Sequence, residues 1–192
     1  MQVKEISDAF LWEKFISDNS PQSFFQSWLW GEITRNTLLI NRRENNLWRF
    51  GIFQNNKLEG IYQIVKVIAR RGTFLHIRHG PIMKNWNKTQ LEYFVSFMRQ
   101  FAKTQKADFI RLSPLIENTQ INKTLIQELG FLDSPIHQMD GEYCWLINLL
   151  PSEDDILAQM RKTTRYLIRQ AGKMEVNIIK STDIKDIPPF LN

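Results

Sequence analysis

Four basic side chains near the C-terminal end recur at a four-residue spacing: Arg161, Arg165, Arg169 and Lys173. This spacing places all four on one face of a helix. A guanidinium group can donate two parallel hydrogen bonds to phosphate oxygens, so the stripe could bind a phosphate or another anion. The alternative is an exposed basic face that binds nothing specific. Tyr166 follows Arg165 and could either contact a ligand or anchor the helix through its ring.

The positive charge of the chain is concentrated in two stretches that contain no acidic residue. The 192 residues include 25 Lys and Arg and 20 Asp and Glu, a formal net charge of +5. Residues 60–91 hold six basic residues, and residues 156–174 hold five. The rest of the chain is therefore net negative. Segregated positive charge can attract an anionic partner, although a solvated face is the alternative for either stretch.

The histidines and the single cysteine are weaker candidates. His79 precedes a Gly-Pro pair at the expected end of a strand, where a histidine can either shuttle protons or occupy a turn. His76, His79 and His137 lack the carboxylate spacing of a metal site, so we expect no bound metal. Cys144 excludes a disulfide framework, and its apolar neighbours are typical of a core residue.

Several function classes lack their motifs. No Gly-x-Ser-x-Gly segment is present, which argues against a serine hydrolase. The Gly-rich loop that binds the pyrophosphate of coenzyme A is also missing, because Gly72 and Gly172 each stand alone. The N-terminus lacks the apolar segment of a signal peptide, and no apolar run reaches the roughly 18 residues that span a membrane. We therefore expect a cytoplasmic protein.

The hydrophobic periodicity predicts a mixed α/β fold (α+β mixed) in which one sheet carries helices on both faces. Two N-terminal helices precede three antiparallel strands joined by short turns, and helices and strands then alternate. Helices are expected at 7–19, with Ser7 as the N-cap, and at 28–37, 89–104, 118–129 and 152–172. Strands are expected at 47–53, 58–69, 73–79, 107–112, 143–150 and 176–179. This order matches the GNAT acyltransferase fold, an analogy of fold rather than of function.

Several segments resemble the FemABX family, in the order in which that family has them. Residues 160–173 are similar to its signature helix, and residues 25–32 resemble its N-terminal segment around Trp30-Gly31. Further similar segments lie at 71–72, 78–82, 109–114, 129–131 and 145–149. Two positions depart from the family pattern. Thr34 stands where many relatives have a lysine that contacts phosphate, and Ser113 stands where many have an aspartate.

The resemblance implies an aminoacyltransferase that builds the interpeptide bridges of peptidoglycan. Such an enzyme moves an amino acid from aminoacyl-tRNA to the stem peptide of a UDP-linked or lipid-linked precursor. Aminoacyl-tRNA would be a co-substrate, no cofactor is expected, and peripheral contact with the inner membrane face is one expected interaction. No catalytic residue is assigned; the substrate-binding residues would be Arg35, Arg78, His79, Arg161, Arg165, Tyr166 and Arg169.

Family members usually carry two GNAT-like domains. The resemblance therefore implies that residues 1–150 form the first domain and residues 151–192 only the opening helix and strand of an incomplete second one. We expect weak or no activity from this chain alone. Two other functions stay open: an N-acyltransferase that uses acyl-CoA, and a non-catalytic module that binds tRNA or anionic lipid. Binding of coenzyme A would favour the first, and salt-sensitive binding without turnover the second.

Overall fold

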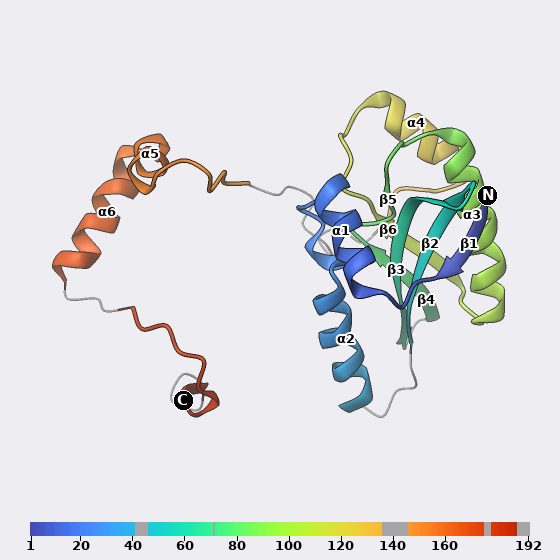
Figure 1. Cartoon of the computed structure of the whole chain (residues 1–192), viewed down its shortest axis with the longest axis horizontal. Helices are drawn as coiled ribbons and strands as arrows, with labels where there is room; N and C mark the ends of the chain where they lie inside the picture. The colour runs from blue at the N-terminus through green and yellow to red at the C-terminus, as the bar shows by residue number, and fades with distance from the viewer. Residues whose placement is uncertain (41–45, 71, 136–145, 175–177, 188–192) are drawn as a thin grey trace. The chain divides into compact units, whose positions relative to one another are not determined.

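The computed structural model describes residues 1–40, 46–70, 72–135, 146–174 and 178–187. Contacts between residues divide the chain into two units, Met1–Glu142 and Tyr143–Asn192. In the described residues, the first unit contains the sheet and the α-helices α1 to α4, and the second contains the α-helices α5 and α6 (Figure 1). Over the described ranges, no helix is both long enough and apolar enough to cross a membrane.

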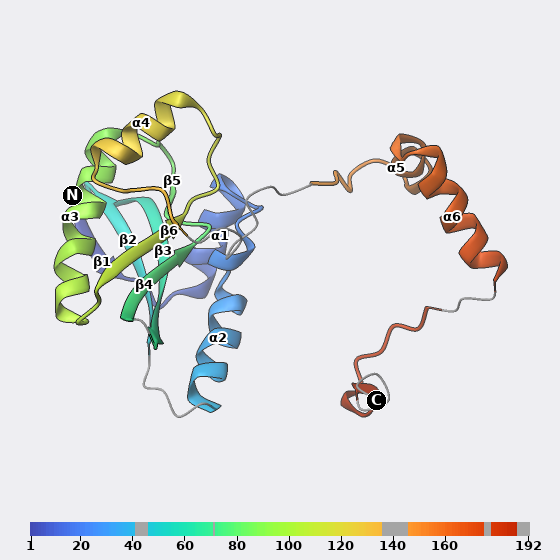
Figure 2. The ribbon, with the colours of Figure 1, turned by 180° about the vertical axis from the view of Figure 1, so that it is seen from behind.

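The first unit is built on a six-stranded mixed sheet with the strand order β1-β2-β3-β4-β6. Neighbours along β1 to β4 are antiparallel, whereas β6 pairs with β4 in parallel, and the short β5 pairs with β3 (Figure 2). The expected antiparallel meander and the mixed sheet are thus confirmed. The strands are β1 Gln2–Glu5, β2 Leu47–Gln54, β3 Lys57–Ala69, β4 Gly72–Arg78, β5 Ile82–Met83 and β6 Phe109–Ser113.

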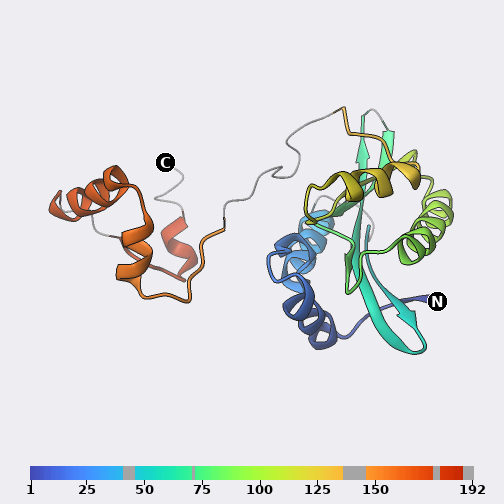
Figure 3. The same ribbon diagram turned by 90° about the horizontal axis from the view of Figure 1, so that it is seen from above.

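Helices cover both faces of this sheet, as expected, and each face has its own hydrophobic core (Figure 3). On one face, Trp12, Phe15 and Ile16 of α1 pack with Ile61 and Ile82. On the other, α3 packs Leu91, Phe94, Val95 and Met98 onto Tyr62, Ile64, Leu75 and Ile77. Ile61 and Tyr62 serve opposite cores because successive strand side chains point to opposite faces. The helices are α1 Ala9–Asn19, α2 Trp28–Ile40, α3 Lys88–Thr104 and α4 Gln120–Glu128, with the 3₁₀ helix η1 at Phe24–Gln26.

Two details near the N-terminus differ from the sequence expectation. The N-cap of α1 is Asp8 rather than Ser7, because the Asp8 carboxylate accepts hydrogen bonds from the backbone N–H groups of Phe10 and Leu11. The strand β1 was not expected, since Gln2–Glu5 contains a single apolar residue, Val3. Antiparallel pairing with β2 makes this segment a strand, and local hydrophobic patterning does not report such pairing.

The hydroxyl group of Tyr62 is buried inside the α3-side core. The residue is 0% exposed, and its oxygen has no hydrogen-bond partner among the described residues. Phe50 and Phe94 contact its ring. Burial in these surroundings raises the pKa of the Tyr62 hydroxyl well above its ordinary value of about 10.

Replacing Tyr62 with phenylalanine should therefore raise the free energy of unfolding by about 1 kcal/mol at pH 7, because an unpaired polar group leaves the core. The folded state holds Tyr62 neutral, whereas the unfolded residue ionises above about pH 10. The free energy of unfolding of the wild type should therefore fall as the pH rises above about 10, and that of Y62F should fall less. Urea titrations at pH 7 and 10.5 measure both effects. Tyr93→Phe is the matched control, because the half-buried Tyr93 donates to the Met1 carbonyl oxygen; an equal alkaline loss in Y62F and wild type would contradict the prediction.

The second unit contains α5 Glu153–Gln159, α6 Lys162–Lys173 and the 3₁₀ helix η2 Ile184–Asp186. The single helix expected at 152–172 was wrong, because Met160 and Arg161 have extended backbone angles that separate two helices. The Arg165 guanidinium donates to the carbonyl oxygens of Ala158 and Met160, at 2.7 and 2.8 Å, and so occupies two acceptors that α5 leaves unpaired at its end. Ser152 is the N-cap of α5, since its hydroxyl accepts a hydrogen bond from the Asp155 backbone N–H.

Two strands expected in this unit are not found where they can be checked. Residues 146–150 and 178–179 have no strand structure, while 143–145 and 176–177 lie outside the described residues. Neither α5 nor α6 contains a buried residue, and apolar side chains such as Leu167 and Ile168 are exposed. A strand needs a partner for its backbone N–H and C=O groups, and the described part of this unit supplies none.

Candidate functional site

A glutamine side chain forms hydrogen bonds to the backbone of β3 and β4 where these two strands are no longer paired with each other. β3 pairs with β4 from Val65 to Ala69 and with β5 at Gly60 and Ile61. Between these two pairings, the backbone N–H of Gln63 donates to Gln26 Oε1 at 2.6 Å, and Gln26 Nε2 donates to the Arg78 carbonyl oxygen at 2.6 Å. The Gln26 side chain is 1% exposed. This buried side chain therefore joins the middle of β3 to the end of β4 through hydrogen bonds.

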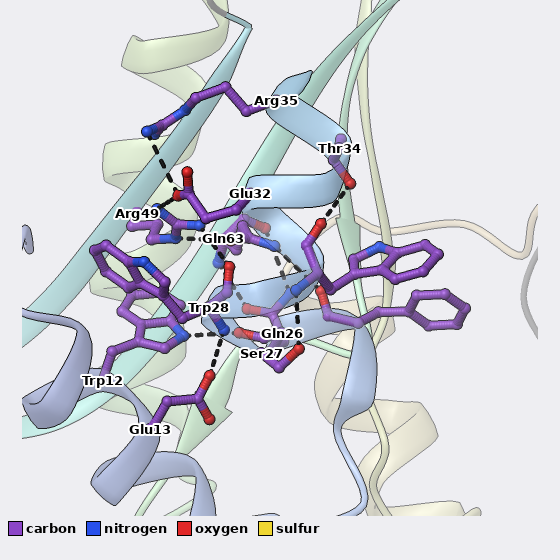
Figure 4. A network of polar contacts seen from close by, with 12 residues as sticks. Trp12, Glu13, Gln26, Ser27, Trp28, Glu32, Thr34, Arg35, Arg49 and Gln63 are labelled. Carbon is purple, nitrogen blue, oxygen red and sulfur yellow. Dashed lines mark hydrogen bonds and ion pairs between the residues drawn. The ribbon is translucent and has the colours of Figure 1, made fainter. Parts of the chain in front are cut away.

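A buried arginine lies next to this glutamine (Figure 4). Arg49 of β2 is 3% exposed, and its guanidinium donates to Gln63 Oε1, Glu32 Oε1 and the Trp28 carbonyl oxygen, each at 2.9 Å. It also lies over the Trp28 ring, 3.7 Å from its centroid. Burial lowers the pKa of Arg49, and the hydrogen bond with Glu32 opposes that shift. A guanidinium stays protonated in proteins, so Arg49 is a buried cation that ties β2, β3 and α2 together.

The close approach of α2 to the sheet requires glycine at position 31. A Cβ atom added to Gly31 would overlap Arg49 Nη2 and Gln63 Oε1. Both atoms are already committed to the buried network and cannot shift without breaking it. The glycine of the Trp-Gly motif is thus explained by contact between the helix and the network.

The chain turns sharply at His79, at the carboxyl end of β4. His79 has φ of +53°, the left-handed region that non-glycine residues rarely adopt, and it is 7% exposed. Its backbone N–H donates to Ser113 Oγ, and its carbonyl oxygen accepts from Ser23 Oγ, both at 3.3 Å. Ser113 ends the parallel strand β6, in register with Arg78. Arg78, His79 and Ser113 therefore meet at the carboxyl ends of two parallel strands, where ligands bind in open α/β sheets.

The site residues predicted for the first unit occupy two neighbouring parts of this region. Arg78 and His79 lie together at the turn that follows β4, which we call the corner. Arg35 of α2 forms an ion pair with Glu32, with 3.5 Å between Nη1 and Oε1, so it belongs to the edge of the Arg49 network. Thr34, at the position where relatives carry lysine, donates its hydroxyl to the Trp30 carbonyl oxygen of its own helix. Its side chain is thus used in an intrahelical hydrogen bond.

The other predicted site residues belong to the second unit. Arg161 precedes α6 as its N-cap residue, so the helical stripe consists of Arg165, Arg169 and Lys173. Arg165 is half-buried by its bonds to the end of α5. Tyr166 is 63% exposed. The expectation of one continuous stripe is therefore corrected, because the chain is extended at Arg161.

The sequence interpretation missed the buried network itself. Arg49 is the single charged residue in the mostly apolar strand β2, and this is a recognisable signal, because a buried cation needs a partner. Gln26 and Gln63 carry no such signal, since a glutamine is ordinary in a turn or a strand. Cys144, His137 and Trp145 lie outside the described residues.

Other parts of the described chain offer less chemistry. Among the described residues, no three His, Cys, Asp or Glu side chains gather as a metal site would need. Two surface hollows of about 460 and 540 Å³ lie between α3 and α4 and share Glu128, which pairs with Lys88. Neither hollow is lined by a predicted site residue. The corner at Arg78 and His79 therefore remains the candidate site of the first unit.

Comparisons with known proteins agree with this architecture. The chain resembles the structure of FemX, with a TM-score of 0.75 and 17% identity over 99% of this chain and 48% of FemX. It also resembles the aminoglycoside 6'-N-acetyltransferase AAC(6')-IG from Acinetobacter haemolyticus, with a TM-score of 0.50 and 13% identity over 77% of this chain and 100% of that one. At these identities the likeness concerns the fold alone. No curated protein matches the chain.

The fold is thus the GNAT-like fold of acyltransferases, as the order of elements predicted. The sequence matches the FemAB family over residues 11–192, and the chain belongs to that family. It spans about half the length of FemX. The resemblance to the FemABX family is therefore confirmed.

Proposed function

We propose that this chain belongs to an aminoacyltransferase that moves an amino acid from aminoacyl-tRNA to the stem peptide of a peptidoglycan precursor. The observation that carries the proposal is the FemAB family match over residues 11–192. Membership of this family implies an acyltransferase connected with peptidoglycan. Aminoacyl-tRNA as the donor, the precursor as the acceptor and the absence of a further cofactor belong to the proposal.

In the proposed reaction, a stem-peptide amine attacks the ester carbonyl carbon of the aminoacyl-tRNA. A C–N bond forms, the C–O ester bond breaks, and the ribose oxygen leaves with the proton that the amine loses. The aminoacyl ester is already activated, so the protein chiefly has to hold the two substrates in reach and exclude water. This chemistry needs no protein nucleophile.

The corner at the end of β4 is suited to positioning of this kind. Arg78 brings a cation to the carboxyl ends of the parallel strands, and the buried Gln26 and Ser23 hold its backbone and that of His79. A site whose backbone is held by hydrogen bonds loses less conformational entropy when a ligand binds than a mobile loop does. We propose Arg78 and His79 here, Arg35 at the edge of the Arg49 network, and Arg161, Arg165, Tyr166 and Arg169 in the second unit as substrate contacts.

The test is a transfer assay on the protein expressed from its complete reading frame, with radiolabelled amino acids on charged tRNA. UDP-linked and lipid-linked precursors serve as separate acceptors, and several amino acids are tried. We expect label in one precursor, and none when uncharged tRNA and free amino acid replace the charged tRNA. Absence of transfer to either acceptor with every amino acid would overturn the proposal. Calorimetry with coenzyme A is the parallel measurement, and we expect no heat of binding.

A further inference from the structure

Three aromatic rings form a cluster on the surface next to the candidate site. The rings of Phe24, Phe25 and Trp30 contact one another, with centroid distances of 4.7 to 5.2 Å. Phe24 is 53% exposed, and Phe25 and Trp30 are half-buried. We call these three residues the aromatic platform. Phe25 also contacts the candidate site, since the centroids of its ring and the His79 ring lie 4.5 Å apart.

The backbone beneath the platform is firmly held. Gln26, which follows Phe25, makes the buried bonds to Gln63 and Arg78, and Trp12 Nε1 donates to the Gln26 carbonyl oxygen at 2.7 Å. The Ser27 hydroxyl accepts a hydrogen bond from the backbone N–H of Trp30 and so fixes the start of α2. Aromatic rings on a rigid base lose little conformational entropy when they bind a ligand. The arrangement therefore differs from an isolated exposed phenylalanine such as Phe10 of α1.

A cation completes the platform. The Arg78 guanidinium carbon lies 3.4 Å from the centroid of Phe25, so the cation stacks on the ring. A stacked guanidinium keeps its charge and can attract phosphate at the edge of the platform. The exposed part of the platform, chiefly Phe24, offers a surface for a flat, uncharged ring, and every nucleobase has a flat face. The two features together match a base joined to a phosphate.

We propose that the aromatic platform and Arg78 form a nucleotide-binding site, in which a base stacks on Phe24 and Trp30 and a phosphate lies near Arg78. The inference deepens the proposed function and rests on it for the source of the nucleotide, because both proposed substrates carry one. The nucleotide comes either from the UDP of a precursor or from the 3′ end of the tRNA. Nucleotide chemistry is common to the two sources, and the experiment distinguishes them.

The experiment is isothermal titration calorimetry on the full chain with UDP and, separately, with the trinucleotide CCA. We expect one probe to bind, and we expect Phe24→Ala and Trp30→Leu each to weaken it roughly tenfold, as loss of a stacking partner does. Phe10→Ala is the matched control, because Phe10 is 79% exposed on α1, and it should leave the affinity unchanged. Circular dichroism confirms that each variant is folded. Binding should also weaken with salt, because Arg78 attracts phosphate.

Three results would overturn this proposal. One is no binding of either probe at millimolar concentration, and another is equal affinity in wild type and both platform variants. The third is self-association of the chain that Phe24→Ala abolishes, since the platform would then bind a second copy. If the full-length protein transfers the amino acid and the platform variants leave that transfer activity unchanged, this site is refuted and the proposed function stands. Nucleotide binding that depends on the platform, without transfer, would support the site and refute the proposed function.

Discussion

Replacement of Arg49 by methionine should lower the free energy of unfolding by about 3 kcal/mol. The substitution leaves two buried acceptors, Gln63 Oε1 and the Trp28 carbonyl oxygen, without the donor that Arg49 supplies. An acceptor left buried and unpaired costs roughly 1–3 kcal/mol. Glu32 loses its buried partner too, but it is partly exposed and keeps its pairing with Arg35. Urea unfolding followed by circular dichroism measures the change.

A matched control for this prediction is Lys14→Met. Lys14 pairs with Asp18 at 3.0 Å on the surface of α1, with side chains that are 61% and 55% exposed. Exposed pairs of this kind contribute less than about 1 kcal/mol. Similar losses in R49M and K14M would contradict the assignment of Arg49 to a buried network. A cycle that combines Arg49→Met with Gln63→Leu should show coupling between the two sites, because they share a hydrogen bond.

Replacement of Gln26 should have a similarly large effect, with a dependence on pH that identifies its cause. Gln26→Leu removes the donor to Arg78 and the acceptor for Gln63 N–H, which should cost about 3 kcal/mol. Gln26→Glu keeps the shape but places an ionisable carboxyl against two carbonyl oxygens, those of Gln63 and Arg78. Burial and these acceptors raise the pKa of a carboxyl at this position, because only the protonated form can donate a hydrogen bond there.

The sign of the pH dependence follows from that raised pKa. Q26E should be most stable below about pH 4, where the carboxyl is protonated in the folded and the unfolded state alike, and should lose stability as the pH rises through the folded-state pKa. Q26L should show no such change relative to wild type. Unfolding free energies between pH 4 and 8 measure the difference. Gln22→Leu, an exposed glutamine four residues earlier, is the control; parallel pH profiles for Q26E and Q26L would exclude a buried carboxyl.

The elements of the first unit could largely be predicted from the sequence. The three-stranded meander, α3 and the order of helices and strands follow from apolar periodicity, since each of these segments buries one face against the sheet. β1 could not be predicted in this way, because its side chains carry no periodic pattern and its pairing with β2 alone makes it a strand. The interruption between α5 and α6 was also hidden, because nothing in the local sequence reports the bonds of Arg165.

The candidate site, too, could be predicted from the sequence only in part. Arg78 and His79 were predicted as substrate-binding residues from the family resemblance, and their role stays a prediction. Their contact with Phe25 and Ser113 joins residues that lie more than thirty positions away, so no local pattern could have revealed it. Phe25 and Trp30 of the aromatic platform belong to the family segment at 25–32, but their contact with each other and with Phe24 was not predicted.

The sequence by itself determined the family, the class of fold and the segregation of positive charge into two acid-free stretches. These properties depend on composition, periodicity and short motifs, which can be read along the chain. Only the tertiary structure decided that Gln26, Arg49 and Gln63 form one buried polar network with Gly31 against it. Buried polar groups must find partners wherever the fold brings them, and the distance between those partners along the sequence has no fixed value.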